Sequence, residues 1–180
     1  QDQTDHEFEL IRMKSFISFS IVQLLISMQI SAQDYHFKNE FLAKWKNSKE
    51  YTLKVASLMP EDHYDFSPAQ GVRTFREQLD HISEAMVYHA GLSLNISTTS
   101  SKGHSKETIL RNLKNNFEKV EQAILQLDEQ DFEEKVKFWD GPTTRRKLLE
   151  LTYDHFTHHR AQAIVYLRMK DIKPPNYIGW

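Results

Sequence analysis

The sequence predicts an all-α protein, and the simplest arrangement is a bundle of four helices. Glycine and proline are sparse, with five of each among 180 residues, and charged residues make up 27%. This composition suits helices better than a β-sandwich. Apolar residues recur at spacings of three and four in four runs that polar or proline-containing segments separate. An up-down-up-down order is the most economical, and one long crossover is the alternative.

The N-terminal residues are predicted to lie outside the bundle. Residues 13–33 read MKSFISFSIVQLLISMQISAQ, in which a Met-Lys pair precedes an apolar run that ends in small residues. This layout is typical of a signal peptide at 13–32, and the run is short for a membrane span. We expect cleavage near Ala32 and export to the periplasm or the extracellular space; an uncleaved protein would be cytoplasmic. The organisation is an extension with the signal peptide over residues 1–32 and one domain over 33–180.

The first two helices of the bundle are predicted on either side of a loop. Residues 35–58 carry apolar side chains at roughly helical spacing, and residues 59–72 contain two prolines and a glycine, which favour a loop. Thr74 can cap the second helix while Glu77 reaches back to it, which is a capping box. The pattern of this helix fades near residues 94–96. Its stripe consists of Phe75, Leu79, Ile82, Met86 and His89.

The third and fourth helices follow two further breaks. Ser105, at the end of the polar loop 97–105, can cap the third helix. The segment WDGPTT breaks the chain again, and the last helix is predicted from about Thr144 to Met169. The ending KPPNYIGW is an extended tail, because its prolines oppose helix. No segment is expected to form a strand. The stripe of the third helix consists of Ile109, Leu113, Phe117, Val120, Ile124 and Leu127.

The segment DHFTHHRAQ in the last helix holds three histidines within five positions. His155 and His159 are four residues apart, so they share one face about 5–6 Å from each other. Gln162 and Tyr166 project almost in line with His155, because each residue turns the helix by about 100°. His158 could instead pair with His155 at a spacing of three. Spacing alone therefore leaves the choice of ligands open, and surface composition alone could also explain the cluster.

A third candidate ligand, His81, lies in the middle of the second helix beside the core residue Ile82. One inward histidine would by itself be an ordinary hydrogen-bonded core residue. Together with two histidines of the last helix, it would supply three neutral imidazoles in a bundle core and leave a metal with an open position. The chain contains no cysteine, so thiolate ligands are excluded. The candidate metals are zinc or nickel first, then iron or manganese.

Three segments, FREQLDHISEA, DHFTHHRAQAIVYLR and KPPNYIGW, occur in an order that resembles the DinB/YfiT-like family, and LMPEDHYDFSPAQGVRTF resembles its opening loop. The resemblance implies a four-helix bundle that holds a divalent metal. Its ligands would be one histidine of the second helix and two of the last, which are His81, His155 and His159 here. The resemblance thus favours His159 over His158. It also marks Arg160 and Gln162 as motif residues, whereas Ala161 replaces a commoner glycine.

A metal with three histidines predicts an enzyme that acts on a small molecule of unknown identity. The two expected reactions are metal-assisted hydrolysis and, as the resemblance implies for some relatives, activation of a small thiol for transfer or isomerisation. Glu84 and Tyr88 lie one and two turns after His81 and are candidate acid-base groups; their alternatives are a solvated helix face and a core tyrosine. The candidates for a supporting role behind the ligands or at the substrate are Arg160, Gln162 and Tyr166. For Arg160, we expect a structural ion pair rather than contact with substrate.

Two non-enzymatic functions remain as alternatives. The bundle could bind a metal or ligand without turning it over, or it could serve as an interaction protein, with a homodimer as one assembly. The net charge of −2 and the lack of a basic stripe argue against binding of nucleic acid. We also expect no stable membrane span.

Overall fold

The computed structural model describes residues 16, 23, 37–98 and 105–179. The chain divides into two compact units, Gln1–Asn39 and Glu40–Trp180. In the first unit, the described residues 16, 23 and 37–39 are helical. The predicted cleavage point and almost all of the predicted signal peptide lie outside the described residues, so these remain predictions. None of the described helices has the length and apolar character needed to cross a membrane.

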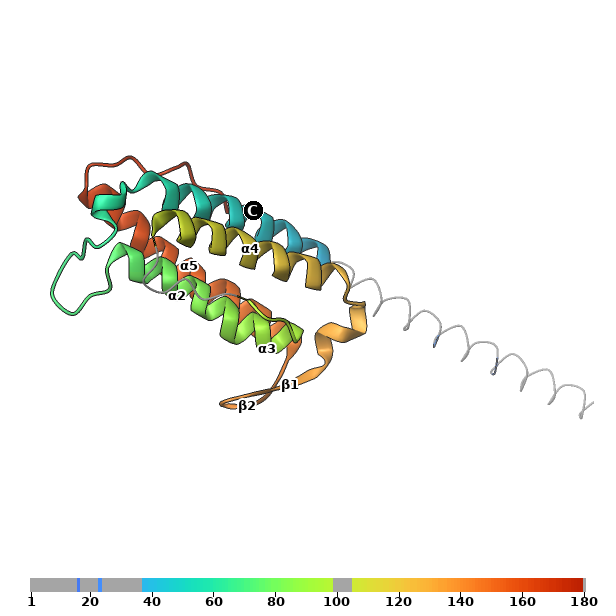
Figure 1. The fold of residues 1–180 in the computed structure, drawn as a ribbon. Helices are drawn as coiled ribbons and strands as arrows, with labels where there is room; N and C mark the ends of the chain where they lie inside the picture. Colours follow the sequence, from blue (N-terminus) through green and yellow to red (C-terminus); the bar gives the residue numbers. More distant parts are fainter. Residues whose placement is uncertain (1–15, 17–22, 24–36, 99–104, 180) are drawn as a thin grey trace, which may run out of the picture. The chain divides into compact units, whose positions relative to one another are not determined.

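The second unit is a bundle of helices, which confirms the predicted all-α class. Residues 40–58 form its first helix. The next helical stretch consists of α2 (Phe75–Ala85), a π-helical turn (Met86–Ala90) and α3 (Gly91–Leu94), and it is followed by α4 (Lys106–Leu125) and α5 (Arg145–Met169). In Figure 1, α2 and α5 run side by side, and α4 lies beside the helix 40–58.

Of the two predicted connections between helices, the structure has the one with a single long crossover, not the up-down-up-down order. The backbone N–H of Lys106 at the start of α4 donates to Glu61 (3.1 Å), and that of Arg76 at the start of α2 donates to the carbonyl of Tyr64 (2.8 Å). Both helices therefore begin at the end of the bundle where the helix 40–58 finishes. Lys119, in the second half of α4, donates to the carbonyl of Ser97, just after α3. The stretch α2–α3 and α4 thus run parallel, and residues 95–105 connect them.

The core is centred on Trp45, whose side chain is fully buried. Its indole Nε1–H donates to the carbonyl of Phe117 in α4 (2.9 Å), which satisfies the one polar atom of the ring. The rings of Phe117 and Phe156 pack against it with centroid separations of 5.1 and 5.3 Å. Since these residues come from three helices, this cluster holds the helix 40–58, α4 and α5 together.

The segment around WDGPTT is a small β-hairpin, so the expectation that no strand forms was wrong. Strand β1 (Lys135–Phe138) pairs antiparallel with β2 (Gly141–Thr144). Gly141 has a φ of +108°, a conformation that glycine adopts without a steric penalty. Val136, Phe138 and Thr143 are partly buried and share one face of the hairpin by the strand register. The hairpin leads directly into α5.

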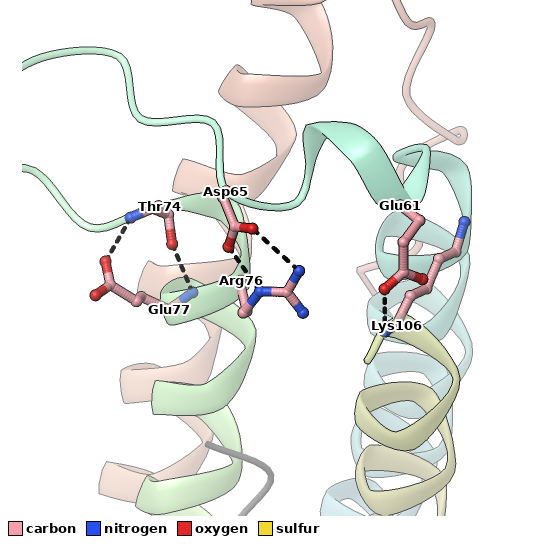
Figure 2. Close-up of polar contacts among 6 residues, drawn as sticks. All are labelled: Glu61, Asp65, Thr74, Arg76, Glu77 and Lys106. Atoms are coloured by element: carbon pink, nitrogen blue, oxygen red, sulfur yellow. Dashed lines mark hydrogen bonds and ion pairs between the residues drawn. The ribbon is translucent and has the colours of Figure 1, made fainter. Parts of the chain in front are cut away.

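Polar contacts fix the start of α2 and of α4 (Figure 2). The predicted capping box is present: Thr74 Oγ1 accepts from the backbone N–H of Glu77 (3.1 Å), and Glu77 Oε2 accepts from the backbone N–H of Thr74 (2.7 Å). The Arg76 Nε–H donates to Asp65 Oδ1 (2.7 Å). This contact links the loop to the first turn of α2. The same helix carries Gln78 and His81.

The hydrogen bond from Arg76 holds the pKa of the Asp65 carboxyl below its usual value. Stabilisation from this exposed pair is therefore fully present above the unfolded pKa of about 4 and is lost as pH falls through the folded value. We expect Asp65→Asn to lower the free energy of unfolding by less than about 1 kcal/mol at pH 7, and by less still at pH 3. Urea unfolding at both pH values measures this difference. An equal loss at pH 3 and pH 7 would contradict the assignment.

Candidate metal centre

The three histidines expected as ligands lie together between α2 and α5. His81 comes from α2, and His155 and His159 lie one turn apart on α5. The ligand nitrogens of the three side chains are all within 4.8 Å of one another. Nε2 of His155 is 3.1 Å from Nε2 of His81. His159 is buried, while His81 and His155 are partly exposed, so the cluster is closed on the bundle side and open on the other.

Two of the histidines are oriented by hydrogen bonds to their other ring nitrogen. His159 Nδ1 lies 2.7 Å from Gln78 Oε1, and His81 Nδ1 lies 3.0 Å from Glu84 Oε2. Both oxygens are acceptors, so each Nδ1 carries the proton and each Nε2 keeps its lone pair. Metal-binding histidines in proteins are held in the same way by an oxygen acceptor behind the ring.

Gln78 is the centre of a hydrogen-bond network behind the histidines. Its side chain is buried, and its Nε2 donates to Gln162 Oε1 (2.7 Å) and to the hydroxyl of Tyr166 (3.2 Å). The Tyr166 hydroxyl donates to the carbonyl of Arg73 (2.9 Å). Gln162 and Tyr166, predicted to follow His155 along one face, are thus brought to the same network. Sequence reasoning missed Gln78, although it lies one turn before His81.

The electrostatics keep the ligands in the form that a metal needs. Burial, followed by repulsion from His81 whenever that ring is protonated, lowers the pKa of His155 to about 4 and that of His159 to about 3. Both side chains are therefore neutral at pH 7. Tetrahedral coordination with metal–nitrogen bonds of about 2.0–2.1 Å would separate two ligand nitrogens by roughly 3.3 Å. The 3.1 Å between Nε2 of His81 and Nε2 of His155 is close to this value, and all three ligand nitrogens lie within 4.8 Å of one another, so the group could hold a metal ion.

The other expected site residues lie in different surroundings. Glu84 is beside His81, with 41% of its side chain exposed. Tyr88 lies on the π-helical turn and is 51% exposed, with its ring 6.1 Å from that of Phe138 in the hairpin. His158 is exposed and accepts from Gln162 Nε2 (2.7 Å). His158 is thus on the outer side of α5, apart from the group formed by the other three histidines.

Arg160 points towards the helix 40–58. Its buried guanidinium donates to Thr52 Oγ1 (3.2 Å) and Thr157 Oγ1 (3.3 Å), and it lies over the rings of Tyr51 and Phe156. Within the part of the chain that the structure describes, its partners are neutral, so the expected ion pair is not formed there. Desolvation in this environment lowers the pKa of Arg160.

Replacement of Gln78 by leucine is expected to weaken metal binding by about 10- to 100-fold. Leucine keeps much of the volume but removes the acceptor that fixes the His159 ring. Competition with a chromogenic chelator measures the affinity of the full chain for Zn²⁺. The control is Gln122→Leu, since Gln122 is exposed on α4. A folded Gln78→Leu protein with unchanged affinity would show that the network does not support the ligands.

The model of the DinB family matches residues 28–177 of the chain. The uncharacterized protein YjoA of Bacillus subtilis is 26% identical over 136 residues, which cover 72% of this chain and 88% of YjoA. The crystal structure of YjoA, a DinB-like protein, matches with a TM-score of 0.66 and 20% identity over 78% of this chain and 99% of that one. A DinB-like protein from Bacillus cereus matches with a TM-score of 0.67 and 20% identity, covering 76% and 95% of the two chains. The chain belongs to the DinB family.

Proposed function

We propose that this protein is a divalent-metal-dependent enzyme that acts on a small molecule, with hydrolysis as its reaction. The observation that carries the proposal is the convergence of His81, His155 and His159, with two of their Nε2 atoms freed by hydrogen bonds behind the rings. Among the described residues, no fourth histidine or carboxylate joins this group. Three ligands with an open position are typical of a catalytic site, and three imidazoles suit zinc or nickel, then iron or manganese.

A bound divalent ion supplies Lewis-acid chemistry, because it polarises a substrate oxygen and lowers the pKa of water. The chain's own residues would take up the proton that this water loses and pass it on. Glu84 accepts from His81 with one oxygen, and its partly exposed carboxylate leaves the other oxygen able to take up a proton. Tyr88 is exposed on the same helical stretch and can donate a hydrogen bond to substrate. Hydrolysis is favoured over thiol transfer because it needs no second substrate other than water.

The test is metal-dependent turnover by the full chain, purified without a histidine tag. Protein stripped with a chelator and protein reloaded with zinc or nickel are compared on panels of esters, amides and small thiols with electrophiles. We expect ester or amide hydrolysis that appears only with metal, is lost in His159→Ala and is retained in His158→Ala. If only the thiol substrates are turned over, the reaction is thiol transfer and the proposal of hydrolysis is wrong. Stoichiometric metal without any turnover would establish a non-catalytic binding protein.

We also propose that residues 13–32 direct export. The support is the charged start, the apolar run and the small residues before position 33. Expression of the full chain in a bacterial host, followed by fractionation and intact-mass measurement, tests this proposal. A secreted or periplasmic product that begins near Gln33 is expected. An unprocessed cytoplasmic product would contradict it.

A further inference from the structure

A second group of rings adjoins the three histidines on the side of the hairpin. The ring centroid of His89 lies 5.5 Å from that of His155 and 5.7 Å from that of Phe138. Tyr88 completes the group at 5.4 Å from His89 and 6.1 Å from Phe138. We call Tyr88, His89 and Phe138 the aromatic wall. His89 lies between His155 and Phe138, so the rings connect the histidine cluster with the hairpin.

Two irregular elements build the aromatic wall. Tyr88 and His89 lie on the π-helical turn Met86–Ala90, which interrupts the regular helix between α2 and α3. Such turns change the direction of side chains and are frequent at functional sites. Phe138 ends β1, immediately before the turn of the hairpin. Tyr88 is half-exposed and Phe138 is only partly buried, so the wall is open to solvent beside the cluster.

The wall contains a polar atom with no bonding partner in the described part of the chain. His89 Nδ1 is buried but makes no hydrogen bond, and the same holds for Thr143 Oγ1, on the hairpin face that also carries Phe138. Native proteins leave few buried polar atoms unsatisfied, because each costs free energy. The ring of His89 is itself partly exposed, so a turn of the ring would bring Nδ1 to its open side. A ligand with a polar group beside its own ring would then satisfy this atom, and His89 can donate or accept according to its tautomer.

We propose that the aromatic wall is the specificity subsite of the metal centre and binds a planar aromatic ring of the substrate. The ring packs against Tyr88 and Phe138, and a polar substituent on it bonds to Nδ1 of His89. The reactive end of the same molecule then reaches the position in front of His81, His155 and His159. This inference rests on the proposed function, because it requires a metal with an open position.

The experiment compares two metal-binding probes that differ by one ring. Acetohydroxamate and benzohydroxamate are titrated by calorimetry into the zinc-loaded full chain. We expect benzohydroxamate to bind about tenfold more tightly, the effect of one good ring contact. Phe138→Leu, which keeps an apolar side chain in the hairpin, should remove this preference without changing acetohydroxamate binding. The control is Tyr177→Ala, since Tyr177 is an exposed aromatic in the tail beside Tyr51.

The outcomes separate this inference from the proposed function. If zinc binds but neither hydroxamate does, the open position is absent and the proposed function fails. If both probes bind the unaltered protein equally, or Phe138→Leu keeps the preference, the aromatic subsite is wrong. A second arm uses the three hydroxybenzohydroxamates. At least one should bind more tightly than benzohydroxamate, and His89→Leu should abolish that gain; a gain that survives in His89→Leu would overturn the assignment of His89.

Discussion

Alanine in place of His81, His155 or His159 is expected to remove the bound metal. The unaltered chain should carry about one divalent ion, as in three-ligand sites generally, and each variant should lose it almost completely. Two remaining imidazoles hold the ion more weakly than three, and in the His81 and His159 variants the lost side chain also breaks the contact behind it, with Glu84 and Gln78 respectively. Elemental analysis after gel filtration measures the stoichiometry.

The matched control is His158→Ala. His158 lies on the same helix, one residue from His159, but it is exposed and contacts Gln162 on the outer side. This variant should keep its metal. If His158→Ala loses metal as completely as His159→Ala does, the ligand set proposed here is wrong. Circular dichroism of each variant separates loss of the ligand from loss of the fold.

Trp45→Ala is expected to lower the free energy of unfolding by about 3–5 kcal/mol. The indole is fully buried, packs against Phe117 and Phe156, and donates to the Phe117 carbonyl. Its removal opens a large cavity where three helices meet and removes the indole hydrogen bond to that carbonyl. Urea unfolding followed by far-ultraviolet circular dichroism gives the midpoint and the slope from which the loss is obtained.

Two further tryptophan variants delimit this effect. Trp45→Phe keeps most of the ring packing and loses the hydrogen bond, so its loss should be clearly smaller. Trp139 is 75% exposed beside Phe138, and Trp139→Ala should change stability by less than about 0.5 kcal/mol. A loss for Trp45→Ala no greater than that for Trp139→Ala would show that the proposed core cluster does not hold the bundle together.

The features that could be predicted from the sequence are those that depend on local patterns, such as helix caps and the spacing of residues along a helix. The capping box of Thr74 and Glu77 marks the start of α2, and Ser105 marks the start of α4; both caps form as expected. A spacing of four residues placed His155 and His159 on one face of α5. The position of His81 beside the buried Ile82 indicated that it points inward. The grouping of His81 with His155 and His159, rather than His158, was what the family resemblance implied.

Other features depend on contacts that no local pattern records. An amphipathic helix packs equally well in either direction, so apolar stripes could not decide between alternating helices and the crossover after α3. The hairpin consists of two four-residue strands; lysines alternate with partly buried residues in β1 only, and β2 (GPTT) shows no such alternation, so the signal is too short to read. Gln78 resembles any helical glutamine until its partners His159 and Tyr166, more than 80 residues away, are brought beside it.

The long sequence separation within the metal centre has a kinetic consequence. His81 and His155 are 74 residues apart, so the site exists only after α2 has docked on α5. Closing such a long loop costs chain entropy before its contacts are gained, so we expect this site to be completed late in folding. A bound ion therefore stabilises interactions that the transition state largely lacks, which slows unfolding far more than it speeds folding. The ion would act mainly on the lifetime of the native state, and so on resistance to proteolysis and heat inactivation.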